Sequence, residues 1–151
     1  MKKIIPLIMI ASLVLASCTK KGDPSQVKIG IAKIVQHPAL DAAEQGIIDV
    51  INENGIKAEF DLQNANGDVN TAAQIASQFK VKKVNVAVGI ATPVAIALST
   101  TLKDTPVVFG TVTDPVGAGL VDTVEHGKNN VTGMSDAIPT VEHIKLFAKI
   151  T

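Results

Sequence analysis

The stretch from Val84 to Leu98, Val-Asn-Val-Ala-Val-Gly-Ile-Ala-Thr-Pro-Val-Ala-Ile-Ala-Leu, joins a β-branched apolar run to an alanine-rich run. The first run predicts a buried strand and the second predicts a helix. Gly89 permits a sharp exit from the strand, Thr92 is a suitable N-cap, and Pro93 fits the first helical turn. In an open α/β sheet, such a junction presents free backbone N–H groups at the helix N-terminus and often binds a ligand.

The rest of the chain repeats this alternation of apolar strands and amphipathic helices. The segment 56–62 alternates apolar and polar residues and is expected at an edge of the sheet, whereas 106–112 is apolar throughout and is expected inside it. The alternation predicts a Rossmann-like α/β fold, a parallel sheet with helices on both faces. Strands are expected at 27–35, 56–62, 84–88, 106–112 and 130–134. Helices are expected at 38–54, at 93–102 and from 140 onward, and a further helix is expected to begin after Asp68, which is its N-cap.

The composition restricts the class of protein. The chain has 151 residues, 14 basic and 14 acidic, and every basic residue is a lysine. A neutral chain without arginine is a poor candidate for binding nucleic acid. Hydrophobic residues make up 46% of the chain, which is enough for a core, but Trp and Tyr are absent, so that core must be aliphatic.

The N-terminus has the pattern of an export signal. Two lysines precede the apolar run Ile4–Leu15, which is shorter than the ~20 residues that span a membrane. The run ends in Leu-Ala-Ser before Cys18, and this ending resembles the lipobox of bacterial lipoproteins. The resemblance implies removal of residues 1–17 and lipidation of Cys18, with 18–26 as a polar tether. The alternative is an ordinary signal peptide with a cysteine nearby.

Five motifs occur in order along the chain, and together they resemble a known family. They are the lipobox, Val-Lys-Ile-Gly-Ile-Ala-Lys-Ile-Val-Gln-His-Pro-Ala-Leu-Asp, Gly-Ile-Ala-Thr-Pro, Val-Thr-Asp-Pro-Val and Asn-Val-Thr-Gly-Met-Ser-Asp. This set is similar to the substrate-binding lipoproteins of ABC transporters, in the branch associated with uptake of tryptophan or other aromatic amino acids. The resemblance implies export and a lipid anchor on a bacterial membrane, facing the periplasm or the cell exterior.

The same resemblance implies a domain organisation. The family fold, of the type I periplasmic-binding-protein kind, has two Rossmann-like lobes joined by a hinge, with the ligand in the cleft, and its members are about twice as long as this chain. We therefore expect residues 27–139 to form the first ligand-binding lobe. Residues 140–151 are expected to begin a crossover helix toward a second lobe that the chain does not contain. A terminal helix that packs onto the sheet is the alternative.

Four loops should meet at the carboxyl ends of the parallel strands and form the binding site. The hydroxyl of Thr92 and the nearby N–H groups suit the carboxylate of a free amino acid. Asp114 or Asp136 suits the ammonium group, and the residues after the first strand could close the rim or touch the ligand side chain. The expected ligand-binding residues are Gln36, His37, Ala91, Thr92, Thr113, Asp114 and Asp136.

Each of these residues also has a purely structural interpretation. Thr92 can cap its helix, and His37 can be a loop or cap residue. Asp114 can hold its own turn, and Asp136 can brace the segment that follows the last strand.

No pattern in the chain indicates catalysis. The Gly-x-Gly-x-x-Gly, Walker A and Gly-x-Ser-x-Gly motifs are absent, and the three histidines are scattered along the sequence. We therefore expect neither enzyme activity, nor a metal, nor a cofactor. The favoured function is a solute-binding lipoprotein that delivers a small zwitterion, an aromatic amino acid by family resemblance, to a membrane permease. The alternatives are a Rossmann-like or flavodoxin-like enzyme and a ligand-sensing regulator, which would carry a DNA-binding helix-turn-helix at its N-terminus.

Overall fold

The computed structural model describes residues 26–150, so the predicted signal peptide, Cys18 and nearly all of the tether lie outside the described residues. The order of strands and helices is the predicted one. The elements are β1 (Val27–Lys33), α1 (Pro38–Glu53), β2 (Ala58–Asn64), α2 (Val69–Lys82), β3 (Val86–Ile90), α3 (Thr92–Thr101), β4 (Val107–Val112), β5 (Val131–Ser135) and α4 (Thr140–Ile150).

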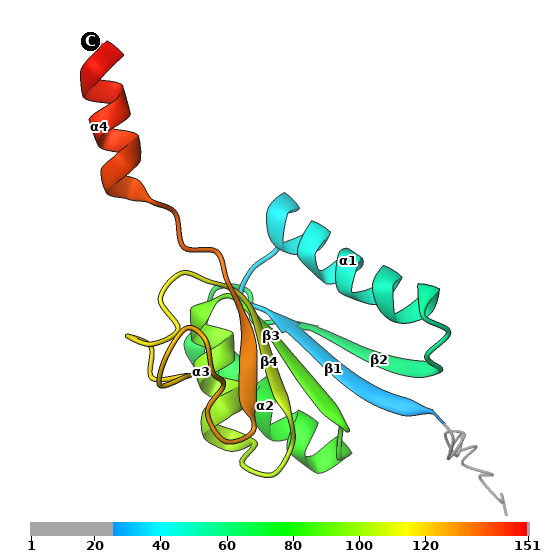
Figure 1. Cartoon of the computed structure of the whole chain (residues 1–151). Helices are drawn as coiled ribbons and strands as arrows, with labels where there is room; N and C mark the ends of the chain where they lie inside the picture. The colour runs from blue at the N-terminus through cyan, green and yellow to red at the C-terminus, as the bar shows by residue number, and fades with distance from the viewer. Residues whose placement is uncertain (1–25, 151) are drawn as a thin grey trace, which may run out of the picture.

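The strands form one sheet in the order β2-β1-β3-β4-β5, and all neighbouring strands run parallel (Figure 1). The fold class is therefore confirmed, with β2 at an edge and β4 inside the sheet as predicted. β2 and β3 begin two residues later than expected. Ile56 and Val84 instead donate their N–H groups to the ends of α1 and α2, with N···O distances of 3.2 Å each.

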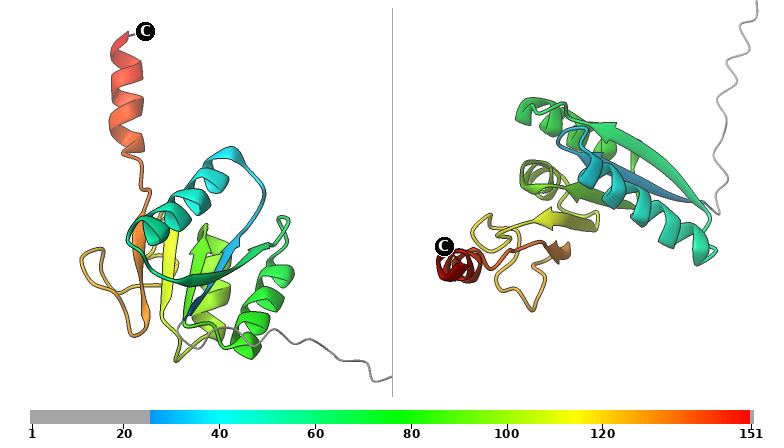
Figure 2. Two further views of the ribbon diagram at one scale, coloured as in Figure 1. Left: turned by 90° about the vertical axis from the view of Figure 1, so that its right-hand side faces the viewer. Right: turned by 90° about the horizontal axis from the view of Figure 1, so that it is seen from above.

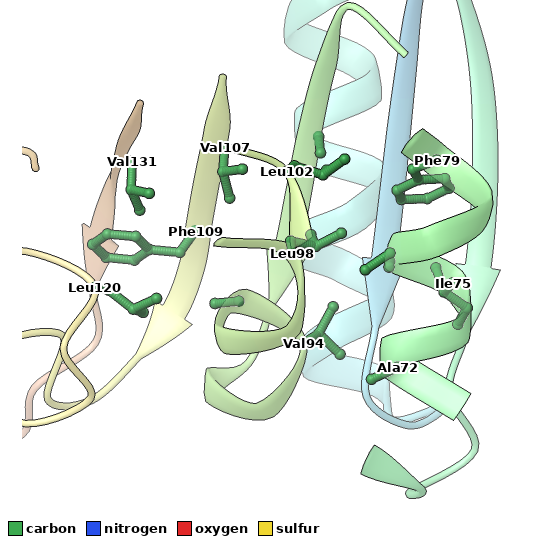
Figure 3. Close-up of a cluster of buried hydrophobic side chains, with 14 of the residues drawn as sticks. Ala72, Ile75, Phe79, Val94, Leu98, Leu102, Val107, Phe109, Leu120 and Val131 are labelled. Atoms are coloured by element: carbon green, nitrogen blue, oxygen red, sulfur yellow. The ribbon is translucent and has the colours of Figure 1, made fainter. Parts of the chain in front are cut away.

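Helices α2 and α3 cover one face of the sheet with a fully buried apolar cluster (Figure 3). Phe79 of α2 and Leu98 of α3 have no exposed surface. Asp68 caps α2 as predicted, because its Oδ1 accepts a hydrogen bond of 2.6 Å from the N–H of Thr71. Hydrogen bonds from the backbone and side chain of Thr71 lower the pKa of the Asp68 carboxyl.

Helix α1 covers the opposite face of the sheet and packs on large strand residues (Figure 2). Ile31 of β1 and Ile90 of β3 are fully buried beneath it. The apolar side chains of α1 are only partly buried, and none of its residues is buried completely.

The structural role of Gly89 differs from the predicted one. It lies inside β3 rather than at the exit of the strand, and the chain turns two residues later. A Cβ at this position would come within 2.9 Å of the Cα of Ala95 on α3. Gly89 is therefore a point of close approach between α3 and the sheet, and a side chain there would hold the helix away.

Helix α4 extends away from the carboxyl edge of the sheet (Figures 1 and 2). All of its residues are exposed, so the alternative in which it packs onto the sheet is wrong. Between residues 26 and 150, none of the helices combines the length and apolar character that crossing a bilayer requires.

Candidate functional site

The carboxyl ends of the five strands lie at one edge of the sheet, since the strands are all parallel. Lys33 at the end of β1 pairs in register with Asn64 of β2 and with Ile90 of β3. From this edge the chain continues to α1 on one face after β1 and to α3 on the other face after β3. The position between β1 and β3 is therefore the switch point of the sheet, where ligands bind in folds of this topology.

The α3 side of this switch point is formed by Ala91 and Thr92. Ala91 is the N-cap, with φ 81° and ψ 152°, a backbone conformation found almost only at glycine. Its N–H donates to the carbonyl of Gly110 on β4 at 3.0 Å. The prediction that Thr92 caps the helix is wrong, because Thr92 is already the first helical residue and no side chain caps α3.

The hydroxyl of Thr92 is consequently not used as a cap. Thr92 is half-buried beside Pro93, and both line an apolar groove between α2 and α3. The first-turn N–H groups of α3 have no partners within the helix, and Pro93 contributes none. The start of α3 therefore offers backbone donors, a hydroxyl that has no hydrogen-bond partner within residues 26–150, and the positive end of the helix dipole.

The ends of β4 and β5 bring Thr113 and Asp136 together. The Thr113 hydroxyl donates to Oδ1 of Asp136 at 3.0 Å, and the Ser135 hydroxyl donates to the Thr113 carbonyl at 3.1 Å. Asp114 holds its own turn, since its Oδ1 accepts from the N–H of Gly117 at 2.8 Å. Both carboxylates lie on exposed residues, and each keeps one oxygen outside these hydrogen bonds.

Gln36 and His37 lie in the exposed loop between β1 and α1. His37 is the N-cap of α1, and its Nδ1 accepts from the N–H of Ala39 at 3.3 Å. Gln36 lines a cavity that the loop shares with the ends of β1 and β2. The two residues thus lie on the opposite side of the switch point from Ala91 and Thr92.

The sequence did not identify a charged cluster next to this loop. Lys33 Nζ donates to Asp41 Oδ1 at 2.6 Å and to Glu44 Oε1 at 2.8 Å, and the Lys33 and Glu44 side chains are only 13% and 14% exposed. Hydrogen bonding to Asp41 and then to Glu44 raises the pKa of Lys33 despite desolvation, which acts in the opposite direction. The signal available in the sequence was Lys33 itself, a lysine at the end of a strand directly after Ile-Gly-Ile-Ala.

Thr111, at the end of β4, is a second residue at this edge that was not identified from the sequence. This β-branched residue has φ 52°, and its buried hydroxyl has no hydrogen-bond partner in the part of the chain that the structure describes. It lies beside the irregular pairing of β4 with β5. Residues with strained backbone conformations, Ala91 and Thr111, therefore lie at the ends of both β3 and β4, at the same edge of the sheet.

Residues 26–150 contain no group of three or more His, Cys, Asp or Glu side chains arranged to hold a metal ion. What the edge offers is a set of hydrogen-bond donors at α3 and carboxylate acceptors beyond β4 and β5. A sheet with this strand order has the doubly wound α/β topology, in which ligands bind at the carboxyl ends of the strands.

The chain belongs to the ABC transporter substrate-binding protein family, whose sequence model matches residues 28–151. The tyrosine-binding protein of Clostridioides difficile is 39% identical over 137 residues, which are 87% of this chain and 40% of that protein.

Solved structures show the same likeness. A conserved domain protein from Vibrio cholerae O1 biovar El Tor is 45% identical, with a TM-score of 0.78, over 81% of this chain and 43% of that one. The ABC domain from Streptococcus pneumoniae in complex with L-Trp is 37% identical, with a TM-score of 0.77, over 82% of this chain and 43% of that one. The chain therefore spans less than half the length of these relatives.

Proposed function

We propose that this chain is part of an extracytoplasmic substrate-binding protein of an ABC importer and that it binds a zwitterionic amino acid of the aromatic type. The observation that carries the proposal is the complementary chemistry at one sheet edge, with backbone and hydroxyl donors at the start of α3 and carboxylates after β4 and β5. Two relatives are described as a tyrosine-binding protein and as a complex with L-Trp, and both ligands carry these two charged groups.

The ligand carboxylate is proposed to lie at the start of α3. There it accepts hydrogen bonds from the Thr92 hydroxyl and from first-turn N–H groups, and it interacts favourably with the helix dipole. The methyl side chain of Ala91 leaves room for the close approach of the ligand to the backbone. The ligand ammonium group donates to Asp114 or Asp136, while Thr113 orients Asp136 through its 3.0 Å hydrogen bond.

Residues 27–139 are proposed to be one ligand-binding lobe, from which α4 leads away. The protein is proposed to act without chemistry, cofactor or metal, and to deliver its ligand to a permease in the membrane. The proposed lipid anchor is Cys18, which attaches the exported protein to a bacterial membrane. Incorporation of radiolabelled palmitate by the wild-type protein but not by Cys18→Ala would test the anchor.

The absence of Trp and Tyr from the chain gives a direct binding assay, because all fluorescence in a titration with L-Trp comes from the ligand. We expect weak, saturable binding, since the loops of a single exposed edge contact the ligand from one side. Thr92→Val should weaken this binding about tenfold or more, the effect of losing a hydrogen bond to a charged group.

Thr100→Val is the matched control, because Thr100 is exposed at the far end of the same helix. It should bind L-Trp as the wild type does. Equal affinities of the wild type and Thr92→Val would remove Thr92 from the site. Failure of the wild type to bind either L-Trp or L-Tyr would overturn the proposed ligand class.

A further inference from the structure

The edge of the sheet opposite the candidate site is formed by the amino ends of the strands. Figure 1 shows the start of β1 at the end of the molecule opposite α4. Backbone hydrogen bonds join three strand starts at this edge. The N–H of Val27 donates to the carbonyl of Lys57 at 2.9 Å, and the N–H of Asn85 donates to the carbonyl of Lys28 at 2.8 Å.

Exposed lysines gather at this amino edge. Helix α2 connects the carboxyl end of β2 to the amino end of β3, so its last turn, with Lys80 and Lys82, and its C-cap Lys83 lie here. Lys28 and Lys82 line one cavity, which joins the end of α2 to β1 and β2. Together with Lys57, the edge presents five lysines, and all five are exposed.

Carboxylates are fewer than lysines on the elements that form this part of the edge. Glu53 lies in the last turn of α1, and Glu59 and Asp61 lie on β2. Asp61 Oδ2 accepts from Lys82 Nζ at 2.6 Å, and the other four lysines have no ion pair within residues 26–150. Those residues as a whole contain 10 lysines and 13 acidic residues, so the positive charge is local to this edge.

An exposed apolar side chain lies among the lysines. Val81 is 81% exposed, and no other large apolar side chain of residues 26–150 is more exposed. It lies between Lys80 and Lys82 and is followed by Lys83. An apolar group flanked by lysines suits a membrane interface, where the apolar group enters the headgroup layer and the ammonium groups stay at the phosphates. Val81 and the five lysines form the amino-end patch.

We propose that the amino-end patch lies on an anionic membrane surface, with Val81 in the headgroup layer. The charges are complementary, because lysines close to anionic lipid headgroups are attracted to them. This inference rests on the proposed lipid anchor at Cys18. Only eight residues separate Cys18 from Gln26, and their extended length is at most about 28 Å, so the anchor keeps this edge close to the bilayer. The candidate ligand site at the opposite edge then faces the solution.

A fluorescent label at either end of α2 tests which edge meets the membrane. The full-length protein, produced in a bacterium that lipidates exported proteins, is bound to vesicles of phosphatidylcholine with or without phosphatidylglycerol. Val81→Cys carries an environment-sensitive dye in the patch. Val69→Cys carries it at the other end of the helix, about 18 Å away, where the valine is also exposed. With phosphatidylglycerol, the Val81→Cys label should brighten about twofold, and high salt should remove the gain. The Val69→Cys label should not respond.

Removing charge from the patch should release it from the membrane. Lys80→Gln with Lys83→Gln, in labelled Val81→Cys, should lower the ratio of docked to undocked protein about 25-fold, since each lysine at an anionic surface contributes about a factor of five. Lys145→Gln with Lys149→Gln, the same change of charge on α4, is the control and should leave the ratio unchanged.

Three results would overturn the proposal. An anchored protein whose Val81→Cys label ignores phosphatidylglycerol overturns the patch and leaves the proposed anchor standing. Equal responses of the Val81→Cys and Val69→Cys labels do the same, because no face is then preferred. A wild-type protein that binds neither kind of vesicle overturns both the patch and the anchor.

Discussion

The two faces of the sheet are built differently, although the same strands supply both. On the face toward α2 and α3, β1 and β3 present Gly30, Ala32, Ala87 and Gly89, whereas toward α1 they present Ile29, Ile31, Val88 and Ile90. Small residues let the helices approach until Phe79 lies over Gly30, where an added Cβ would come within 2.7 Å of its ring. Large residues face α1, and the side chains of this helix remain partly exposed.

The two faces therefore differ in how tightly their helices pack on the strands. The α2 and α3 face is tightly interdigitated and fixes the start of α3, where the ligand carboxylate is proposed to bind. The α1 face carries the charged cluster of Lys33, Asp41 and Glu44 at its edge.

The largest expected effect comes from placing a methyl group on the face toward α2 and α3. In Gly89→Ala, the new Cβ would lie 2.9 Å from the Cα and 3.0 Å from the N of Ala95, which are backbone atoms that move only with the whole of α3. We expect a loss of about 1–3 kcal/mol in the free energy of unfolding, the usual cost of overpacking. Urea denaturation followed by circular dichroism measures it.

Gly46→Ala is the matched change on the other side of the sheet. Gly46 lies inside α1, and an added Cβ meets no atom within 4 Å. Alanine is a better helix former than glycine, so the free energy of unfolding of this variant should rise by about 0.5–1 kcal/mol. The same substitution would then lower the free energy of unfolding on one face and raise it on the other. A change in the same direction in both variants would refute the contrast.

A smaller effect is expected from the charged cluster at the edge of the α1 face. Lys33→Met leaves two carboxylates facing each other and should cost about 1–2 kcal/mol near neutral pH, between the values for exposed and buried pairs. The pKa of Lys33 is raised, so its contribution is complete below 10.5, the ordinary value, and is lost as the pH rises through the folded-state pKa.

The difference in stability between the wild type and Lys33→Met should therefore shrink in strongly alkaline solution. Lys57→Met provides the control, because Lys57 is exposed and has no ion pair among those found in residues 26–150. A deficit in Lys33→Met that persisted unchanged at high pH would mean that lost packing, rather than charge, is responsible.

Most of the fold could be predicted from local sequence, but the details of the site could not. The order of strands and helices along the chain follows from apolar periodicity, the parallel sheet follows from the crossovers, and the meeting of the loops follows from parallel strands. The conformation of Ala91 is imposed by its hydrogen bond to Gly110 on the next strand, against its own preference, so local rules chose Thr92 as the cap instead. The Lys33 cluster likewise depends on how α1 lies over β1.

The smallest expected effect tests whether Ala91 stores strain at the site. At φ 81° and ψ 152°, alanine costs about 1–3 kcal/mol, and glycine relieves this while losing about 0.4–1 kcal/mol through the entropy of the unfolded chain. The centres of these two ranges differ by about 1 kcal/mol, so Ala91→Gly should stabilise the protein by about 1 kcal/mol in urea denaturation. Ala97→Gly, inside α3, should instead lower the free energy of unfolding by about 1 kcal/mol. If Ala91→Gly also binds L-Trp more weakly, the strain holds the start of α3 ready for the ligand. A destabilised Ala91→Gly would show that the methyl group contributes packing that outweighs the strain, and the tightly packed face would then extend to the rim of the site.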